Sequence, residues 1–219
     1  MSGRSSVSRE TPPPPPLARA VFAASLPTAE HYARLLATDG VRRGLIGPAE
    51  APRLWERHLL NCALLADGIE VAARVADLGS GAGLPGLALA ISRPDLSLTL
   101  VEPALRRTTF LEEAVTVLGL DNVEVVRARA EELHGRRRFR VVTARALAPL
   151  DRLLRWSMPL VEPGGVLLAM KGRAVAGELA SASARGLLGD YDVSIVEYGA
   201  GKILPPTTAL RVETARPAD

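Results

Sequence analysis

The ten residues from Asp77 to Gly86, DLGSGAGLPG, carry the clearest chemical signal in the sequence. They follow an apolar run of strand type, VADL at 75–78, and precede a helical run, LALAIS. Glycines allow positive φ angles and let a ligand lie against bare backbone. A turn between a parallel strand and a helix N-terminus lies at the carboxyl end of the strand, where α/β sheets bind ligands. The segment therefore predicts a binding crevice formed by Asp77, Gly79, Gly81 and Gly83.

Two kinds of ligand fit such a loop. GAGLPG at 81–86 satisfies G-x-G-x-x-G, the dinucleotide signature, whereas the longer string from Asp77 resembles the first motif of the class I S-adenosylmethionine methyltransferases. A dinucleotide pyrophosphate is anionic, so a neighbouring carboxylate repels it. The sulfonium and ammonium groups of S-adenosylmethionine are cationic, so Asp77 favours this ligand. The alternative interpretation of Asp77 is an acid that caps a structural turn.

Two acidic positions further along the chain fit the same crevice. Glu102 ends the next strand-like run, 23 residues after Gly79, where a carboxylate is placed to accept hydrogen bonds from ribose hydroxyls. After the third such run comes Arg129-Ala130-Glu131-Glu132, where backbone N–H groups and Glu131 are placed to hold an adenine edge. The alternative for this run is a helix start with acidic residues in its first turn.

Short β-rich runs alternate with helical ones from Arg74 onward, which predicts a parallel sheet covered by helices on both faces. Residues 191–199 and 208–215 have no helix between them and predict an antiparallel pair at one edge. The predicted strands lie at 75–78, 96–102, 123–128, 141–146 and 165–172, and the predicted helices near 85–92, 104–118, 149–160 and 174–188.

Residues 17–73 have a helical pattern and predict a cap in front of the core at 74–219, the two forming one domain. Thr28 is the expected N-cap of a helix through Ala37, with Gly40 as its stop. A second helix over 51–66 places Leu54, His58, Cys62 and Leu65 on one face, where core packing is the favoured interpretation of His58 and Cys62. Residues 1–16, rich in Ser, Arg and Pro, predict a disordered tail.

Composition excludes several other classes of protein. The 219 residues carry 27 Lys and Arg against 24 Asp and Glu, and 47% are hydrophobic, as in a soluble globular protein. One cysteine and three scattered histidines exclude a disulfide and a multi-cysteine zinc site, so we expect no metal. No apolar run reaches the length of a membrane helix. A cytoplasmic protein is therefore the expectation, and nothing in the sequence favours an oligomer over a monomer.

The motifs taken together resemble the RsmG (GidB) family, bacterial methyltransferases that form 7-methylguanosine in 16S rRNA. The resemblance rests on DLGSGAGLPGLALAI, RHLLN at 57–61, the RAEE run, VVTARALAPL and LLAMKG at 167–172. It implies a Rossmann-like class I methyltransferase fold with a mostly parallel seven-stranded sheet, an antiparallel edge strand and a helical N-terminal cap. It also implies S-adenosylmethionine as cofactor and 16S rRNA or the 30S subunit as partner. The residues implied to contact the cofactor are Gly79, Leu84, Ala130, Glu131 and Arg145, and Arg129 and Lys171 would border the guanosine.

The chain shows no Ser-His-Asp set and no paired carboxylates, and methylation at guanine N7 requires neither, because N7 carries a lone pair and no proton. We therefore assign Arg145 and Lys171 to positioning and no residue to acid–base catalysis. Seven arginines within 127–145 are candidates for RNA contact, with a solvated basic turn as the alternative. Two rival functions stay open: an NAD(P)-dependent oxidoreductase that uses the G-x-G-x-x-G loop, and a non-catalytic rRNA-binding or assembly factor.

Overall fold

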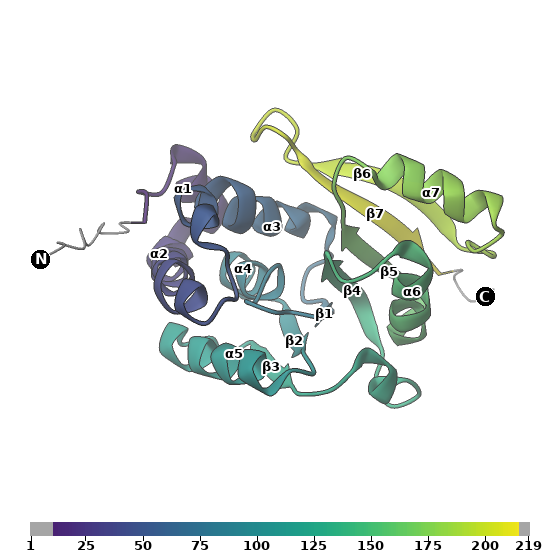
Figure 1. Cartoon of the computed structure of the whole chain (residues 1–219), viewed down its shortest axis with the longest axis horizontal. Coiled ribbons are helices and arrows are strands. Elements are labelled where there is room, and N and C mark those ends of the chain that lie inside the picture. Colours follow the sequence, from purple (N-terminus) through teal and green to yellow (C-terminus); the bar gives the residue numbers. More distant parts are fainter. Residues whose placement is uncertain (1–10, 215–219) are drawn as a thin grey trace, which may run out of the picture.

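A seven-stranded sheet with helices on both faces forms the body of the protein, as the computed structural model shows for residues 11–214 (Figure 1). The strands lie in the order β3-β2-β1-β4-β5-β7-β6. All neighbours from β3 to β5 are parallel, and β7 is antiparallel to both β5 and β6. The strands are β1 (Arg74–Leu78), β2 (Ser97–Val101), β3 (Val123–Val126), β4 (Phe139–Arg145), β5 (Val161–Met170), β6 (Asp192–Tyr198) and β7 (Thr207–Glu213).

This arrangement confirms the predicted fold, with one refinement. The last two strands do pair antiparallel at one edge of the sheet. The strand that runs against the others is β7, however, and it lies second from the edge, inside the outermost strand β6.

Two hydrophobic cores cover the two faces of the sheet, and consecutive strand residues alternate between them. Val141 and Leu168 pack into the core that holds α4, α5 and the cap, whereas Val142 and Leu167 pack into the core that holds α6 and α7. Because both faces are covered, the buried positions of the central strands are mostly apolar, as is typical of a parallel sheet. These helices are α4 (Gly86–Ser92), α5 (Leu105–Leu118), α6 (Leu150–Ser157) and α7 (Val175–Ala184).

The N-terminal cap is helical, as predicted, and lies against α4 and α5 (Figure 1). It contains α1 (Pro16–Phe22), α2 (Leu26–Leu35), a wider helical turn at Leu36–Gly40, and a 3-10 segment at Pro48–Arg53. A continuous helical stretch follows, with a π segment at Leu54–Leu60, α3 at Asn61–Ala63 and a 3-10 turn at Leu64–Gly68. The four positions predicted to share one face of this stretch are all buried: Leu54, His58, Cys62 and Leu65.

The predicted limits of the first cap helix are wrong at both ends. Helix α2 begins at Leu26 with Pro27 in its first turn, since the fixed φ of proline suits that position, so Thr28 is not the N-cap. The helical path also continues past Gly40 and ends at Gly44, which has a φ of +67°. Gly44 makes the left-handed turn that stops a helix, while Gly40 is buried within it.

The proline-rich segment contacts the cap over the residues that the structure describes. Trp55 donates its Nε1–H to the carbonyl of Pro12 at 2.8 Å, and α1 begins at Pro16. Residues 11–16 therefore differ from the disordered tail that we predicted over 1–16, and residues 1–10 lie outside the described part. Within residues 11–214, no helix is long and apolar enough to span a membrane.

Candidate functional site

The glycine loop leaves β1 at Leu78 and enters α4 at Gly86, at the carboxyl edge of the sheet. Gly79, Gly81 and Gly83 have φ angles of +69°, +56° and +91°, which favour glycine at all three positions. Gly79 and Gly81 are partly exposed, whereas Gly83 and Leu84 are buried. The bare backbone expected of the crevice therefore lies at Gly79 and Gly81, while Gly83 serves packing.

Helix α2 of the cap fixes the far side of the loop. The Tyr32 hydroxyl is fully buried and donates to the carbonyl of Ala82 at 2.8 Å. A Cβ on Gly83 would lie 2.9 Å from that hydroxyl and 2.4 Å from Cδ1 of Leu87. The cap and the start of α4 thus hold the loop in its bent path, and no side chain fits at Gly83 unless they move.

Asp77 lies beneath the loop, where it is fully buried. Its Oδ2 accepts the N–H of Gly86 at 3.0 Å, at the start of α4, and Oδ1 has no partner among the described residues. Burial raises the pKa of this carboxyl to about 7, although the hydrogen bond from Gly86 lowers it. The position is the one expected of the alternative, an acid that caps a structural turn. That the charge of Asp77 favours a cationic ligand stays a prediction.

Glu102 follows β2 and connects the loop to the neighbouring strand. One carboxylate oxygen accepts the N–H of Gly81 at 3.1 Å, and the other accepts the N–H of Ala104 at 3.0 Å. Arg107 lies 3.6 Å from the first oxygen. The Glu102 side chain is buried, and each carboxylate oxygen can accept one more hydrogen bond beyond its backbone contact. Two acceptor oxygens suit a ligand with two adjacent hydroxyls, as the ribose prediction requires.

Arg145, at the end of β4, is held by the cap. Its guanidinium donates to Nδ1 of His58 at 2.8 Å and to Sγ of Cys62 at 3.4 Å. Arginine only donates, so Nδ1 is an acceptor and the histidine proton is on Nε2, which donates to Glu50 at 2.8 Å. His58 and Cys62 are thus buried, as we expected of core residues, and also hold Arg145.

The charges around His58 favour its neutral form. Burial lowers its pKa, the positive charge of Arg145 lowers it further, and the hydrogen bond with Glu50 raises it in part. Burial alone would raise the pKa of Glu50, but the hydrogen bond from His58 and the charge of Arg57 bring it below its ordinary value. A neutral His58 is the acceptor that the Arg145 guanidinium needs.

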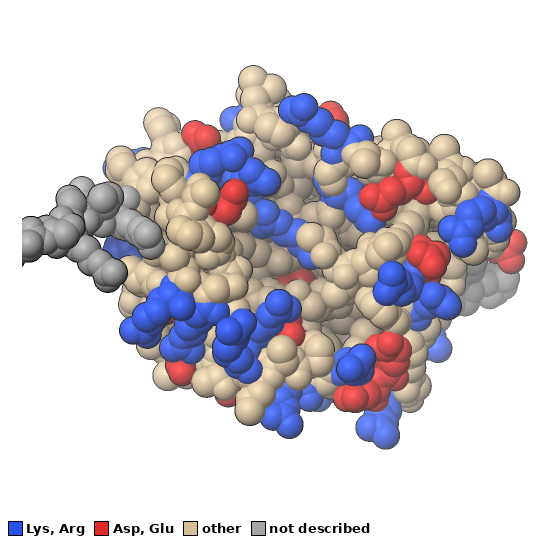
Figure 2. All heavy atoms as spheres, in the orientation of Figure 1, with Lys and Arg blue, Asp and Glu red and all other residues tan. Residues whose placement is uncertain are grey.

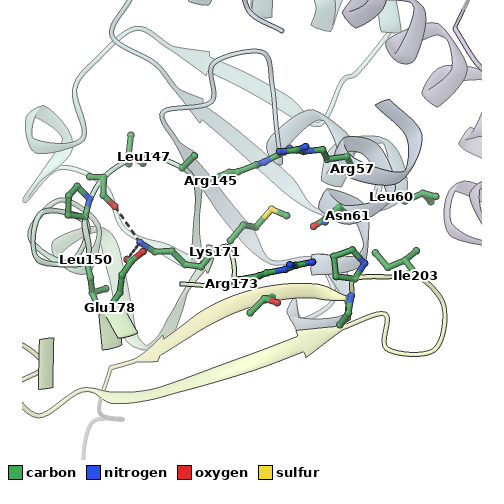
Figure 3. A pocket seen from close by; sticks show the side chains of 18 of the residues that line it. Arg57, Leu60, Asn61, Arg145, Leu147, Leu150, Lys171, Arg173, Glu178 and Ile203 are labelled. Carbon is green, nitrogen blue, oxygen red and sulfur yellow. Dashed lines mark hydrogen bonds and ion pairs between the residues drawn. The ribbon is translucent and has the colours of Figure 1, made fainter. Parts of the chain in front are cut away.

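A large groove of about 1540 Å³ lies beside the loop, and Leu147 forms a wall between the two. Leu147 lines the groove, and its Cδ1 lies 2.4 Å from where a Cβ on Gly79 would be. Figure 3 shows Lys171 and Glu178 pointing toward each other in this groove, with Arg57 and Asn61 of the cap on its other side. The positively charged residues that line it are Arg53, Arg57, Arg145, Lys171, Arg173, Arg185 and Lys202.

Two of the seven arginines within residues 127–145 are engaged in ion pairs within the protein. Arg137 pairs with Glu124, and Arg140 pairs with Glu70 and donates a hydrogen bond to the carbonyl of Gly164. Arg145 alone among them lines the groove. The basic groove instead draws its charges from the cap, β4, the β5–α7 segment and the β6–β7 loop, and Figure 2 shows Lys and Arg side chains on both sides of a hollow in this face.

Arg129, Ala130 and Glu131 follow β3 at the same edge of the sheet. Ala130–Leu133 form a 3-10 turn, whose start is held by Glu132 accepting the N–H of Arg129 at 3.3 Å. Arg129 and Glu131 are exposed and Ala130 is partly exposed. The turn matches the alternative of a helical start with acidic residues, and it leaves the Glu131 carboxylate open to a ligand.

The sequence does not predict Tyr32 or Glu178 in the site, and it predicts His58 as a core residue. Tyr32 and His58 reach the site from the cap, across 50 and 87 residues of chain. Glu178 lies on α7, and its Oε2 accepts from Nζ of Lys171 at 2.6 Å. No local pattern marks these contacts, and only the RHLLN run indicated that the cap takes part. Among the described residues, no group of three His, Cys, Asp or Glu side chains lies close enough to hold a metal ion.

Comparisons with known proteins agree with this geometry. The chain is 65% identical to the ribosomal RNA small subunit methyltransferase G of Nocardioides sp., over 96% of the chain and 85% of the relative. It is 55% identical to the protein of the same name from Thermobifida fusca, over 91% and 84%.

Solved structures share the fold at low identity. A putative S-adenosyl-L-methionine-dependent methyltransferase from Methanococcus maripaludis matches with a TM-score of 0.55 and 13% identity, over 87% of this chain and 93% of that one. A methyltransferase from Pyrococcus furiosus matches with a TM-score of 0.53 and 16% identity, over 69% and 80%. The family model described as rRNA small subunit methyltransferase G matches residues 25–202. The fold is that of S-adenosylmethionine-dependent methyltransferases, and the chain belongs to the rRNA small subunit methyltransferase G family.

Proposed function

We propose that this protein transfers a methyl group from S-adenosylmethionine to guanine N7 in 16S rRNA. The observation that carries the proposal is the shared wall at Leu147, which joins the glycine loop to a basic groove. One side presents bare backbone and a carboxylate, and the other presents positive charge of the kind that phosphates bind. The small-subunit rRNA named in the relatives' descriptions supports the substrate class.

The residues of the loop suit S-adenosylmethionine. Gly79 and Gly81 offer backbone without side chains, and Glu102 offers two oxygens with free lone pairs to the ribose hydroxyls. Ala130 and Glu131 are proposed to lie against the adenine, and Leu84 supports the loop from within. The bound cofactor supplies an electrophilic methyl group on a sulfonium. An acid at Glu102 suits the adenosine ribose of either ligand. The oxidoreductase is disfavoured instead by the family to which the chain belongs.

The chain's own residues then act by positioning. Guanine N7 is already a nucleophile, so no base has to remove a proton. For this reason we assign no residue to acid–base catalysis. Neutral His58 holds the Arg145 guanidinium at the groove, and Lys171 is fixed by Glu178 and by the carbonyl of Ala148 at 3.4 Å. Holding the base against the methyl group in a site with little water supplies the rate enhancement.

The proposal is tested by incubating the protein with methyl-labelled S-adenosylmethionine and unmodified 16S rRNA, either naked or assembled into 30S particles. We expect label in the RNA, and 7-methylguanosine when the nucleosides are separated by mass spectrometry. Gly79→Asp is the control, because its side chain would fill the crevice.

Three results would overturn the proposal. Label in a nucleoside other than 7-methylguanosine refutes the N7 assignment. RNA that is retained without label transfer favours a non-catalytic binding factor. Binding of NADPH without binding of S-adenosylhomocysteine favours the oxidoreductase.

A further inference from the structure

Lys171 and Glu178 form an oppositely charged pair at one end of the groove (Figure 3). Lys171 directly follows β5 and its side chain is only 11% exposed, while Glu178 in the first turn of α7 is 38% exposed. Their Nζ and Oε2 atoms lie 2.6 Å apart, and both residues line the groove. The pair therefore presents one positive and one negative group side by side to whatever enters.

Each member keeps hydrogen-bonding capacity for a ligand. The Lys171 ammonium has three donors, of which two point to Glu178 and to the carbonyl of Ala148. Oε1 of Glu178 has no hydrogen-bond partner in the described part of the chain, and Oε2 keeps a lone pair beyond its contact with Lys171. A ligand can thus be met by one N–H donor and by the two oxygens of one carboxylate.

The negative charge of Glu178 argues against a phosphate at this end of the groove. A phosphate suits the arginines, such as Arg57 and Arg173, because a guanidinium matches its geometry and charge. A carboxylate repels it. A nucleobase is the part of an RNA that benefits from an acceptor-only group.

Of the two purines, the bases that carry N7, guanine matches this pair. Its Watson–Crick edge carries the O6 acceptor beside the N1–H and N2–H donors, which complement an ammonium next to a carboxylate. Adenine presents an amino donor where guanine has O6, and a lone pair where guanine has N1–H, so both contacts become repulsive. Because this edge lies on the opposite side of the base from N7, gripping it leaves N7 free to react.

We propose that Glu178 reads the N1–H and N2–H edge of the target guanine while Lys171 donates to its O6, so that this pair selects guanine. The inference rests on the proposed function, since it needs a guanine as the methyl acceptor. The carboxylate also faces the base that becomes positively charged on methylation, which favours the product charge. Lys171 keeps Glu178 oriented in the groove.

The experiment removes the hydrogen bond between the guanine N2 amino group and Glu178, once by changing the RNA and once by changing the protein. The methylated position is first mapped with the wild type, and 16S rRNA is then ligated from fragments that carry guanosine or inosine there. Inosine lacks the N2 amino group and keeps O6, N1–H and N7. Methylation is measured for the wild type, for Glu178→Ala and for the control Glu113→Ala, which removes another carboxylate of an ion pair, with Arg43, away from the groove.

The wild type and Glu113→Ala should prefer guanosine over inosine in kcat/KM by about 10- to 100-fold, the range for a lost hydrogen bond to a charged group. Glu178→Ala should methylate guanosine more slowly by a similar factor and lose most of that preference, since the missing amino group no longer has a partner. Any intrinsic difference in N7 reactivity affects all three proteins equally and cancels in the comparison.

An unchanged preference for guanosine in Glu178→Ala overturns the inference, even if the overall rate falls. If Glu178→Ala does not fold or does not bind S-adenosylhomocysteine, Glu178→Gln serves instead, because its amide has the same shape but accepts through one oxygen only. Glu178→Gln should also show a smaller preference for guanosine over inosine than the wild type. An unchanged preference in this variant refutes the role of Glu178. A wild type that methylates no guanine refutes the proposed function itself, which keeps the two failures distinct.

Discussion

Replacing His58 by alanine should release Arg145 and lower the stability of the protein. His58 Nδ1 accepts from the Arg145 guanidinium at 2.8 Å, and Nε2 donates to Glu50 at 2.8 Å. Alanine removes both hydrogen bonds and leaves Arg145 with Cys62, a weak acceptor, at 3.4 Å. The cap then loses a polar connection to the end of β4.

The expected loss of stability is large because one partner of His58, Arg145, is charged. A hydrogen bond to a charged group contributes about 1.5–3 kcal/mol. His58 is buried whereas Glu50 is partly exposed, so the contact with Arg145 dominates. The imidazole also leaves an empty space when it is removed. We expect the two effects together to lower the free energy of unfolding by about 2–4 kcal/mol. Urea denaturation at pH 7.5 measures it.

The pH dependence of stability distinguishes the loss of the His58 hydrogen bonds from a loss of packing alone. The pKa of His58 is lowered in the folded protein, so the unfolded chain binds the proton more readily. The contribution of His58 is therefore fully present above its unfolded pKa of about 6.5 and is lost as pH falls toward the lower folded value. The wild type should lose stability between pH 7.5 and pH 5.5 more steeply than His58→Ala does.

Histidine 31 provides the matched control. It lies on α2 and has no hydrogen bond in the described part of the chain, so His31→Ala controls for the loss of an imidazole that holds no partner. Identical slopes for the wild type and His58→Ala would refute the reasoning. A loss of stability below about 0.5 kcal/mol, the range of an ordinary surface substitution, would contradict it as well.

Three further substitutions test other parts of the site. Gly83→Ala should lower the free energy of unfolding by about 1–3 kcal/mol in urea denaturation, because φ is +91° and the new Cβ would lie 2.4 Å from Cδ1 of Leu87; unchanged stability would mean that the loop has room there. Asp77→Asn should gain stability relative to the wild type as pH rises from 4 to 8, because the raised pKa of about 7 makes ionisation of the buried carboxyl costly above its unfolded value; a difference that does not change with pH would contradict the burial argument. Lys171→Ala should lower the rate of RNA methylation at saturating cofactor and leave the affinity for S-adenosylhomocysteine within about twofold, since its ammonium contacts Glu178 and the Ala148 carbonyl rather than the glycine loop; a variant that loses the cofactor and keeps its turnover would reverse this assignment.

The sheet and the glycine turn could be predicted because their signals are local. The alternation of short apolar runs with helical ones predicts which segments of the chain form strands and which form helices. Gly79 and Gly81 mark the turn, because both have positive φ angles there. Glu102 was found because a strand end places its last side chains at a known edge of the sheet. These features depend on residues that are close in sequence.

Other features depend on tertiary contacts and could not be derived from spacing. Asp77 at a strand end is equally compatible with an exposed acid or a buried one, and only the position of α4 decides. Of the arginines of 127–145, Arg137 and Arg140 form ion pairs with carboxylates on other elements and Arg145 lines the groove, and spacing along the chain does not show this. Glu178 meets Lys171 only because β5 and α7 are joined by a short turn.

The central claim is that the glycine loop and Glu102 bind an adenosine cofactor, and calorimetric titration with S-adenosylhomocysteine tests it most directly. The wild type should bind one molecule per chain, and Glu102→Ala should bind at least about tenfold more weakly, the effect of roughly 1.4 kcal/mol, with an unchanged circular dichroism spectrum. Equal affinity of the two proteins, or no binding to the wild type, would contradict it.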